Sequence, residues 1–169
     1  DIDPSSINKT IKVDIALVGD VKIVLEKLIS VFKKNNPDFA ISNKQRISAW
    51  WSQIENWRKK NSLSFVNSKD VIKPQYAVQR LYELTKAQDT FITTEVGQHQ
   101  MWAAQHYKFD KPNRWMTSGG LGTMGYGLPA AIGVQVANPD KLVIDIAGEA
   151  SVLMTMQEMS TAVQYKLPI

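Results

Sequence analysis

Cysteine is absent from the sequence, so the chain can form neither a disulfide nor a metal site built on thiolates. No apolar run is long enough to span a bilayer, which argues against a membrane partner. The N-terminus lacks Met and has neither the basic nor the apolar segment of a signal peptide. We therefore predict a protein that is not secreted, and we interpret the first residues as the interior of a longer chain whose true N-terminus is missing.

A dense basic block is also missing, although the net charge is +4. The lysines are spread mainly over residues 9–86 with acidic residues among them, as on an ordinary solvated surface. This distribution predicts that nucleic acid is not a partner. The 44% of apolar and 21% of charged residues are typical of a globular protein with a buried core.

The first 32 residues predict a strand, a turn and a helix. Residues 11–17 alternate in polarity as a half-buried strand does, Gly19 interrupts them, and Asp20 can cap the following helix. We interpret residues 1–32 as the end of an α/β central domain. We interpret residues 33–72 as a helical connector, which we expect to pack through one apolar and aromatic stripe made of Ile47, Trp50, Trp51, Ile54 and Trp57.

Strands and helices alternate in the remaining residues, 73–169. Pro74 suits the first turn of a helix. This order predicts an α/β fold with a doubly wound parallel sheet that is truncated at its C-terminus. The side-chain pattern predicts strands at 90–96, 114–117, 142–147 and, cut short, 167–169, and helices at 100–106, 128–137 and 154–165.

A glycine-rich loop is the strongest local signal for chemistry. Five of the nine residues from 119 to 127 are glycine, which lets the backbone approach a ligand closely. The helix predicted to follow can offer its free N–H groups to an anion. The spacing fits neither a Walker loop nor the usual dinucleotide fingerprint. A cofactor-binding loop and a flexible surface loop both remain open at this point.

A carboxylate follows the strand predicted at 142–147. Glu149 stands after small residues and at the start of a helix, where it could hold Mg²⁺ while helix N-terminal amides hold a phosphate. The carboxyl ends of parallel strands are where α/β sheets bind ligands. The alternative is that Glu149 or Ser151 merely caps the helix.

Two neutral polar residues follow the strand predicted at 90–96. Gln98 and His99 offer hydrogen-bond donors suited to phosphate oxygens. A single histidine is more often structural, and we interpret His106 in that way. His99 gains a functional interpretation only because all three segments end at the same edge of the predicted sheet.

Together these segments resemble the thiamine-diphosphate enzymes, and most closely the acetohydroxyacid (acetolactate) synthases. The resemblance implies an internal part of the large, catalytic subunit, with a thiamine-diphosphate-binding domain at 73–169 after the end of a FAD-bordering domain at 1–32. Only the connector shows little of this resemblance. The matching runs are DIDP at 1–4, VGDV at 18–21, VGQHQMWAAQ at 96–105, SGGLGTMG at 118–125 and the segment from Gly148 through QEM at 157–159.

The resemblance implies a role for each matching residue. Gln98 and His99 would contact the diphosphate. Gly122 and Met124 would hold the aminopyrimidine ring, with Met124 as the wedge that bends the cofactor. The segment that would hold Mg²⁺ and diphosphate consists of Gly148, Glu149, Ala150 and Ser151, with Glu149 as the metal ligand. The positions matching those that border a structural FAD are Asp1, Ile2, Asp20 and Val21.

The implied reaction is decarboxylation of pyruvate and transfer to a second 2-oxo acid, with the cofactor as electron sink. The products would be acetolactate or acetohydroxybutyrate, precursors of branched-chain amino acids. The implied partners are further copies of the full-length chain, as a homodimer or homotetramer, and a regulatory small subunit. The implied location is the bacterial cytoplasm or an organelle.

Two departures from the family pattern matter. The family metal motif begins Gly-Asp, whereas Glu149 follows Gly148 here, and its extra methylene moves the carboxylate by about 1.5 Å. The Asn pair that completes the motif, and the pyrimidine-binding domain with its activating glutamate, lie outside the sequence. We therefore predict that the chain holds no catalytic residue and forms no acetolactate alone.

Two other functions remain open. One is another thiamine-diphosphate enzyme, such as a pyruvate oxidase or a 2-oxo acid decarboxylase, although Gln98, His99 and Met124 argue against it. The other is a non-catalytic module that binds a phosphate or nucleotide on a Rossmann-like sheet. Competition between thiamine diphosphate and adenine nucleotides would separate the second from both enzymes.

Overall fold

A computed structural model describes residues 1–61 and 63–169; residue 62, within the predicted connector, lies outside the described residues. The chain divides into two compact units, Asp1–Ser62 and Leu63–Ile169, and each is described by itself. None of the helices in the described residues is both long enough and apolar enough to cross a membrane.

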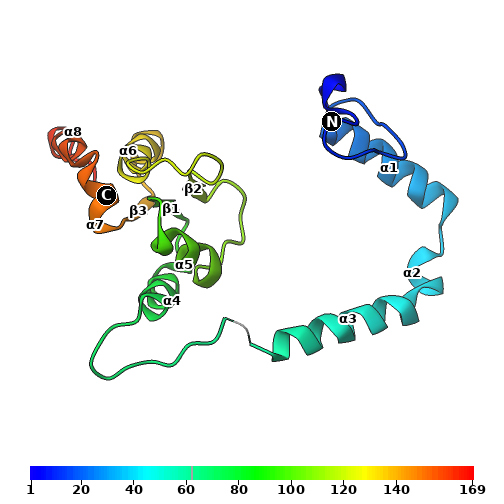
Figure 1. The fold of residues 1–169 in the computed structure, drawn as a ribbon, viewed down its shortest axis with the longest axis horizontal. Coiled ribbons are helices and arrows are strands. Elements are labelled where there is room, and N and C mark those ends of the chain that lie inside the picture. The colour runs from blue at the N-terminus through cyan, green and yellow to red at the C-terminus, as the bar shows by residue number, and fades with distance from the viewer. Residues whose placement is uncertain (62) are drawn as a thin grey trace. The chain divides into compact units, whose positions relative to one another are not determined.

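The first unit is helical (Figure 1). Asp20 begins α1 as predicted, because its carboxylate accepts hydrogen bonds from the backbone N–H groups of Lys22 and Ile23 (3.0 and 3.2 Å). None of its helices contains a buried residue. The elements are η1 (Pro4–Ser6), α1 (Val21–Asn35), α2 (Phe39–Ser42) and α3 (Lys44–Lys59).

The strand predicted at residues 11–17 is wrong, because this segment is irregular. Alternating polarity describes which side chains could be buried, but a strand also needs a neighbour for its backbone groups. The C-terminal end of this segment is instead hydrogen-bonded to the first residue of the chain. The Asp1 ammonium donates to the Leu17 carbonyl (3.1 Å), and Gly19 N donates to the Asp1 carbonyl (2.9 Å).

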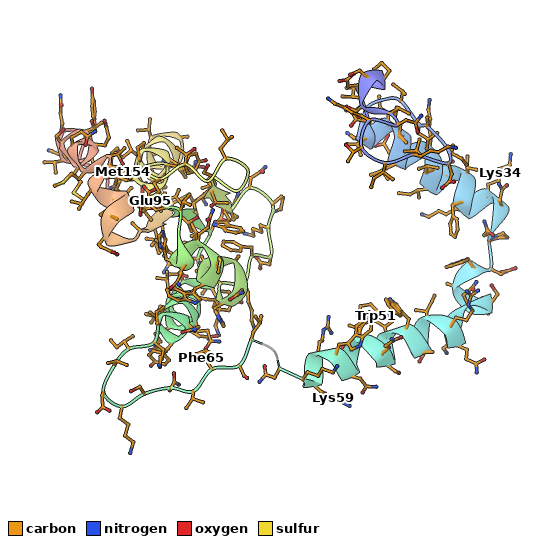
Figure 2. All side chains as sticks on the ribbon, viewed as in Figure 1. Lys34, Trp51, Lys59, Phe65, Glu95 and Met154 are labelled. Atoms are coloured by element: carbon orange, nitrogen blue, oxygen red, sulfur yellow. The ribbon has the colours of Figure 1, made fainter. Side chains whose placement is uncertain are left out.

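The aromatic stripe of α3 forms as predicted but is not buried within its own unit. Trp50, Trp51 and Trp57 are each about half exposed, and Trp51 projects from the helix (Figure 2). Trp50 and Trp57 contact each other edge to face, with ring centroids 5.5 Å apart. Helical periodicity therefore identified the stripe, and two of its tryptophans contact each other.

The second unit confirms the predicted doubly wound parallel sheet. Its three strands lie in the order β2-β1-β3, and both pairings are parallel. Because β1 lies in the centre, the chain leaves it and returns on either side through helices. The elements are α4 (Pro74–Thr85), β1 (Thr90–Thr94), α5 (Gln98–His106), β2 (Trp115–Thr117), α6 (Gly127–Ala137), β3 (Leu142–Ile146), α7 (Glu149–Leu153), η2 (Met156–Glu158) and α8 (Met159–Gln164).

Helices cover both faces of this sheet (Figure 1). On one face, Ile92 of β1 packs with Val78 of α4 and with Tyr107, at the end of α5. On the other face, Phe91 and Val143 pack against Ala131 of α6. Side chains of successive strand residues thus point into two different apolar layers. This explains why every residue of β1 is buried.

Two predictions at the C-terminal end need correction. The helix predicted at 154–165 is instead α7, η2 and α8, and it starts earlier, at Glu149. Thr155 interrupts it with φ −135° and ψ 19°, and its hydroxyl donates to the Gly125 carbonyl (3.4 Å). Residues 167–169 form no strand, because Leu167 N turns back to the Ala162 carbonyl (2.9 Å).

A cluster of ion pairs connects the segments that precede the three strands. Asp89, just before β1, accepts from Arg114 Nε at 2.8 Å and lies 3.4 Å from the ammonium groups of Lys111 and Lys141. The hydrogen bond from Arg114 is the main reason that the pKa of Asp89 lies well below its ordinary value of 3.8. One carboxylate therefore links segments that precede all three strands.

Replacement of this carboxylate should weaken the second unit. We expect Asp89→Asn to lower the urea midpoint at pH 7, because three cations lose their common partner. A carboxylate with a depressed folded-state pKa contributes fully above 3.8 and loses its contribution as the pH falls further. The difference from the unaltered chain should therefore shrink between pH 7 and pH 2.5, followed by tryptophan fluorescence.

The matched control is Glu83→Gln, which breaks an exposed pair with Lys86 on α4 and should shift the midpoint little. Equal midpoints for Asp89→Asn and the unaltered chain at pH 7 would contradict the role of the cluster.

Candidate functional site

The three turns that carry the predicted site leave one edge of the sheet at the same level. Thr94 of β1 pairs with both Thr117 of β2 and Ile146 of β3, and these are the last residues of their strands. The turn before α5, the glycine-rich loop and the turn before α7 therefore start side by side. This confirms the reasoning that placed the three segments at one edge.

The imidazole of His99 lies where two of these turns meet. A Cβ atom added to Gly97 would lie 2.8 Å from the ring carbon Cε1 of His99, and one added to Gly148 would lie 2.9 Å from the same atom. The ring therefore fills a space that only two glycines leave open. Its Nε2 atom is buried without a hydrogen-bond partner among the described residues, which is a donor or acceptor that a ligand could use.

Gln98 and Gln100 flank this histidine and have different surroundings. Gln98 is exposed at the first position of α5. Gln100 Nε2 donates to the Thr117 hydroxyl (2.6 Å) and to the Ser118 carbonyl (3.4 Å). The hydroxyl of Thr94 also donates to Thr117 (2.7 Å). Gln100 thus fixes the start of the glycine-rich loop, a role that sequence reasoning missed.

The backbone of the glycine-rich loop depends on glycine at two positions. Gly122 and Gly125 adopt φ values of +67° and +85°, which favour glycine. Gly125 also lies close to the turn after α7, since an added Cβ would be 3.1 Å from Thr155 Cγ2. Met124, between these glycines, is exposed. The loop therefore presents Gly122 and Met124 from a backbone held against neighbouring elements.

Two carboxylates lie beneath this loop, and sequence analysis assigned a role to neither. Glu95 is fully buried and accepts from the backbone N–H groups of Gly125 (2.7 Å) and Leu128 (3.2 Å). Asp145 accepts from the Thr93 hydroxyl (2.9 Å). Burial, reinforced by the nearby charge of Glu95 and opposed by the Thr93 hydrogen bond, raises the pKa of Asp145 to about 6. The available signal in the sequence was an acidic residue directly after the threonine-rich β1, and another within the otherwise apolar β3.

The turn before α7 holds its own backbone through Ser151. The Ser151 hydroxyl accepts from Gly148 N (3.3 Å) and donates to the Gly148 carbonyl (3.1 Å), while its side chain is buried. This is the capping role that remained open for Ser151. Glu149 and Ala150 are exposed at the first two positions of α7. In the described part of the chain, no three His, Asp or Glu side chains gather as a metal site.

The residues predicted to border FAD lie together in the first unit. Asp1, Ile2, Asp20 and Val21 line one hollow of about 410 Å³. The hydrogen bonds between Asp1 and the segment Leu17–Gly19 bring the N-terminus to the start of α1. These sequence-distant positions therefore share a surface.

The comparisons with known proteins agree with this geometry. Residues 95–169, which contain the three turns, match the family model of the thiamine pyrophosphate enzyme C-terminal TPP binding domain. All 169 residues align, at 48% identity, with the acetolactate synthase isozyme 3 large subunit of Escherichia coli (strain K12). The chain belongs to the acetolactate synthase family of thiamine pyrophosphate enzymes.

Other members of the acetolactate synthase family match over the same length. Identity is 50% with the large subunit of Buchnera aphidicola subsp. Schlechtendalia chinensis and 43% with acetolactate synthase 1, chloroplastic, of Nicotiana tabacum. The chain spans 29% of the two bacterial relatives and 25% of the tobacco one. The resemblance inferred from the motifs is thus confirmed for the family.

Gly127, at the start of α6, should not tolerate a larger side chain. An added Cβ would overlap Asp145 Oδ1 and lie 2.8 Å from the backbone nitrogen of Glu95. Because a backbone atom cannot move aside easily, we expect Gly127→Ala to lower the free energy of unfolding by about 1–3 kcal/mol in urea titration. Gly133→Ala in the same helix is the control, because nothing lies within 4 Å of its added Cβ.

Gly133→Ala should raise the free energy of unfolding by about 0.5–1 kcal/mol, since alanine is the better helix former. If Gly127→Ala were as stable as Gly133→Ala, the close packing of α6 on the strand edge would be wrong.

Proposed function

We propose that this chain is the thiamine-diphosphate-binding portion of a Mg²⁺-dependent acetolactate synthase. The observation that carries the proposal is the position of His99. Its ring lies against Gly97 and Gly148 and so joins two of the three turns, and its buried Nε2 has no partner in the described residues. The match of residues 95–169 to a TPP-binding domain supports thiamine diphosphate as the ligand.

The diphosphate would bind at the junction of these two turns. His99 Nε2 and the exposed amide of Gln98 would donate to its oxygens. The backbone N–H groups at Glu149 and Ala150 begin a helix and are suited to an anion. Ser151 would act by holding the Gly148 turn rather than by contact through its hydroxyl, which is already occupied. Glu149, whose carboxylate is exposed at the same turn, would ligate Mg²⁺.

The aminopyrimidine end would lie against the glycine-rich loop. Gly122 offers backbone without a side chain, and Met124 offers an exposed apolar side chain suited to an aromatic ring. When bound, the cofactor would supply the electron sink that pyruvate decarboxylation needs. The residues of this chain would bind and orient it, with substrates pyruvate and a second 2-oxo acid.

The wider assignments extend this proposal. FAD would border the hollow formed by Asp1, Ile2, Asp20 and Val21. Residues 1–32, 33–72 and 73–169 would be the end of the FAD-bordering domain, the connector and the thiamine-diphosphate-binding domain. The active form would be a homodimer or homotetramer, with a regulatory small subunit as a further partner. Its compartment would be the bacterial cytoplasm or an organelle, since its relatives are bacterial and chloroplastic.

Removal of the histidine ring should weaken cofactor binding. We expect His99→Ala to reduce the affinity for thiamine diphosphate, titrated calorimetrically with Mg²⁺, by about tenfold or more, because one phosphate donor is lost. Gln105→Ala, an exposed position on the same helix, is the control and should bind as the unaltered chain does. Unchanged affinity in His99→Ala would argue against a diphosphate site at this junction.

The length of the metal-binding carboxylate should also matter. We expect Glu149→Asp to tighten Mg²⁺-dependent binding of thiamine diphosphate, because the shorter side chain suits the octahedral geometry that Mg²⁺ requires. Titration of the cofactor at several Mg²⁺ concentrations measures the effect. No change, or weaker binding, would show that Glu149 is adapted to this turn or does not ligate the ion.

A further inference from the structure

Glu95 is the most deeply buried acidic residue that the proposed cofactor contacts leave without a role. It follows β1, and its exposed fraction is 0%. Its backbone nitrogen donates to the Ile146 carbonyl of β3 (3.1 Å), so the residue is fixed to two strands. A buried carboxylate in such a place requires partners for its oxygens.

Both carboxylate oxygens of Glu95 point to the glycine-rich loop. Oε2 accepts from Gly125 N at 2.7 Å and Oε1 accepts from Leu128 N at 3.2 Å, so one side chain bonds both sides of the loop-to-helix junction. An added Cβ on Gly125 would lie 3.3 Å from the Cβ of Met154, which is labelled with Glu95 in Figure 2. Gly125 is thus held between the end of β1 and the end of α7.

We propose that Glu95 is a positioning residue that sets the glycine-rich loop, and through it Gly122 and Met124, against the aminopyrimidine half of the cofactor. Its carboxylate accepts a hydrogen bond from the backbone N–H one residue after Met124, at a glycine with a φ of +85°. The role rests on the proposed function, because it assigns Glu95 to the thiamine diphosphate site.

The proposed role of Glu95 predicts different effects on the two ends of the cofactor. The diphosphate half would be held by His99 and the Gly148 turn, which Glu95 bonds through neither oxygen. The aminopyrimidine half would depend on the loop that Glu95 holds. Loss of the carboxylate should therefore weaken binding of the whole cofactor but leave binding of inorganic pyrophosphate unchanged.

The test uses Glu95→Gln in the full chain, with Mg²⁺ present. Gln keeps the shape but turns an –NH₂ group toward one of the two backbone N–H donors, which leaves that donor unpaired. We expect about tenfold weaker binding of thiamine diphosphate and unchanged binding of pyrophosphate, both by calorimetry. Amide hydrogen exchange at Gly125 and Leu128 should be about tenfold faster. Glu83→Gln, an exposed carboxylate on α4, is the matched control and should change none of these.

The outcomes are distinguishable. Equal thiamine diphosphate affinity in Glu95→Gln and the unaltered chain overturns the positioning role, as does a parallel loss of pyrophosphate binding. If the unaltered chain binds neither ligand, the proposed function itself fails. If circular dichroism shows that Glu95→Gln does not fold, the role is tested on the unaltered chain instead. Thiamine diphosphate should then slow amide exchange at Gly125 more than at Ile92 in β1, and equal slowing contradicts the role.

Discussion

Close backbone approach at one edge of a parallel sheet is the constraint on which the candidate site depends. Three strands end at the same level, so their turns would collide if each residue carried an ordinary side chain. Gly97, Gly127 and Gly148 lie at the points of nearest approach. The space they leave is filled by one imidazole ring and two carboxylates. Glycine is needed here because it has no side chain, and the polar groups occupy the space that this leaves.

The sequence was sufficient to predict the parallel sheet and the edge at which three turns meet. The threonine- and isoleucine-rich segment of β1 and the apolar segment of β3 have the composition of buried strands, and small residues predict α6. Since parallel strands share a carboxyl edge, the polar residues after each strand were expected to meet there. Local pattern was enough because each of these elements is stabilised by the same two apolar layers.

Other features could not be predicted, because they depend on contacts between distant residues. Residues 11–17 alternate correctly for a strand, yet pattern gives no information on whether a partner strand exists. Thr155 interrupts a helix because Gly125, thirty residues earlier, approaches it closely. Glu95 stands beside a recognisable motif, but nothing in its spacing indicates that two backbone amides would satisfy its carboxylate. These features require the folded structure.

Two carboxylates lie near the proposed diphosphate site: Glu95 is fully buried and Asp145 is partly buried. The charge of Glu95 is directed at the N–H groups of Gly125 and Leu128, which stabilise it within the fold. Burial raises the pKa of Asp145 to about 6, and the nearby charge of Glu95 acts in the same direction. The ring of His99 lies at the Gly97–Gly148 junction, beside the backbone amides that begin α7. Glu95 therefore stabilises the loop from below, while the proposed anion site at the edge has hydrogen-bond donors and, in Glu149, a carboxylate that would face it through Mg²⁺.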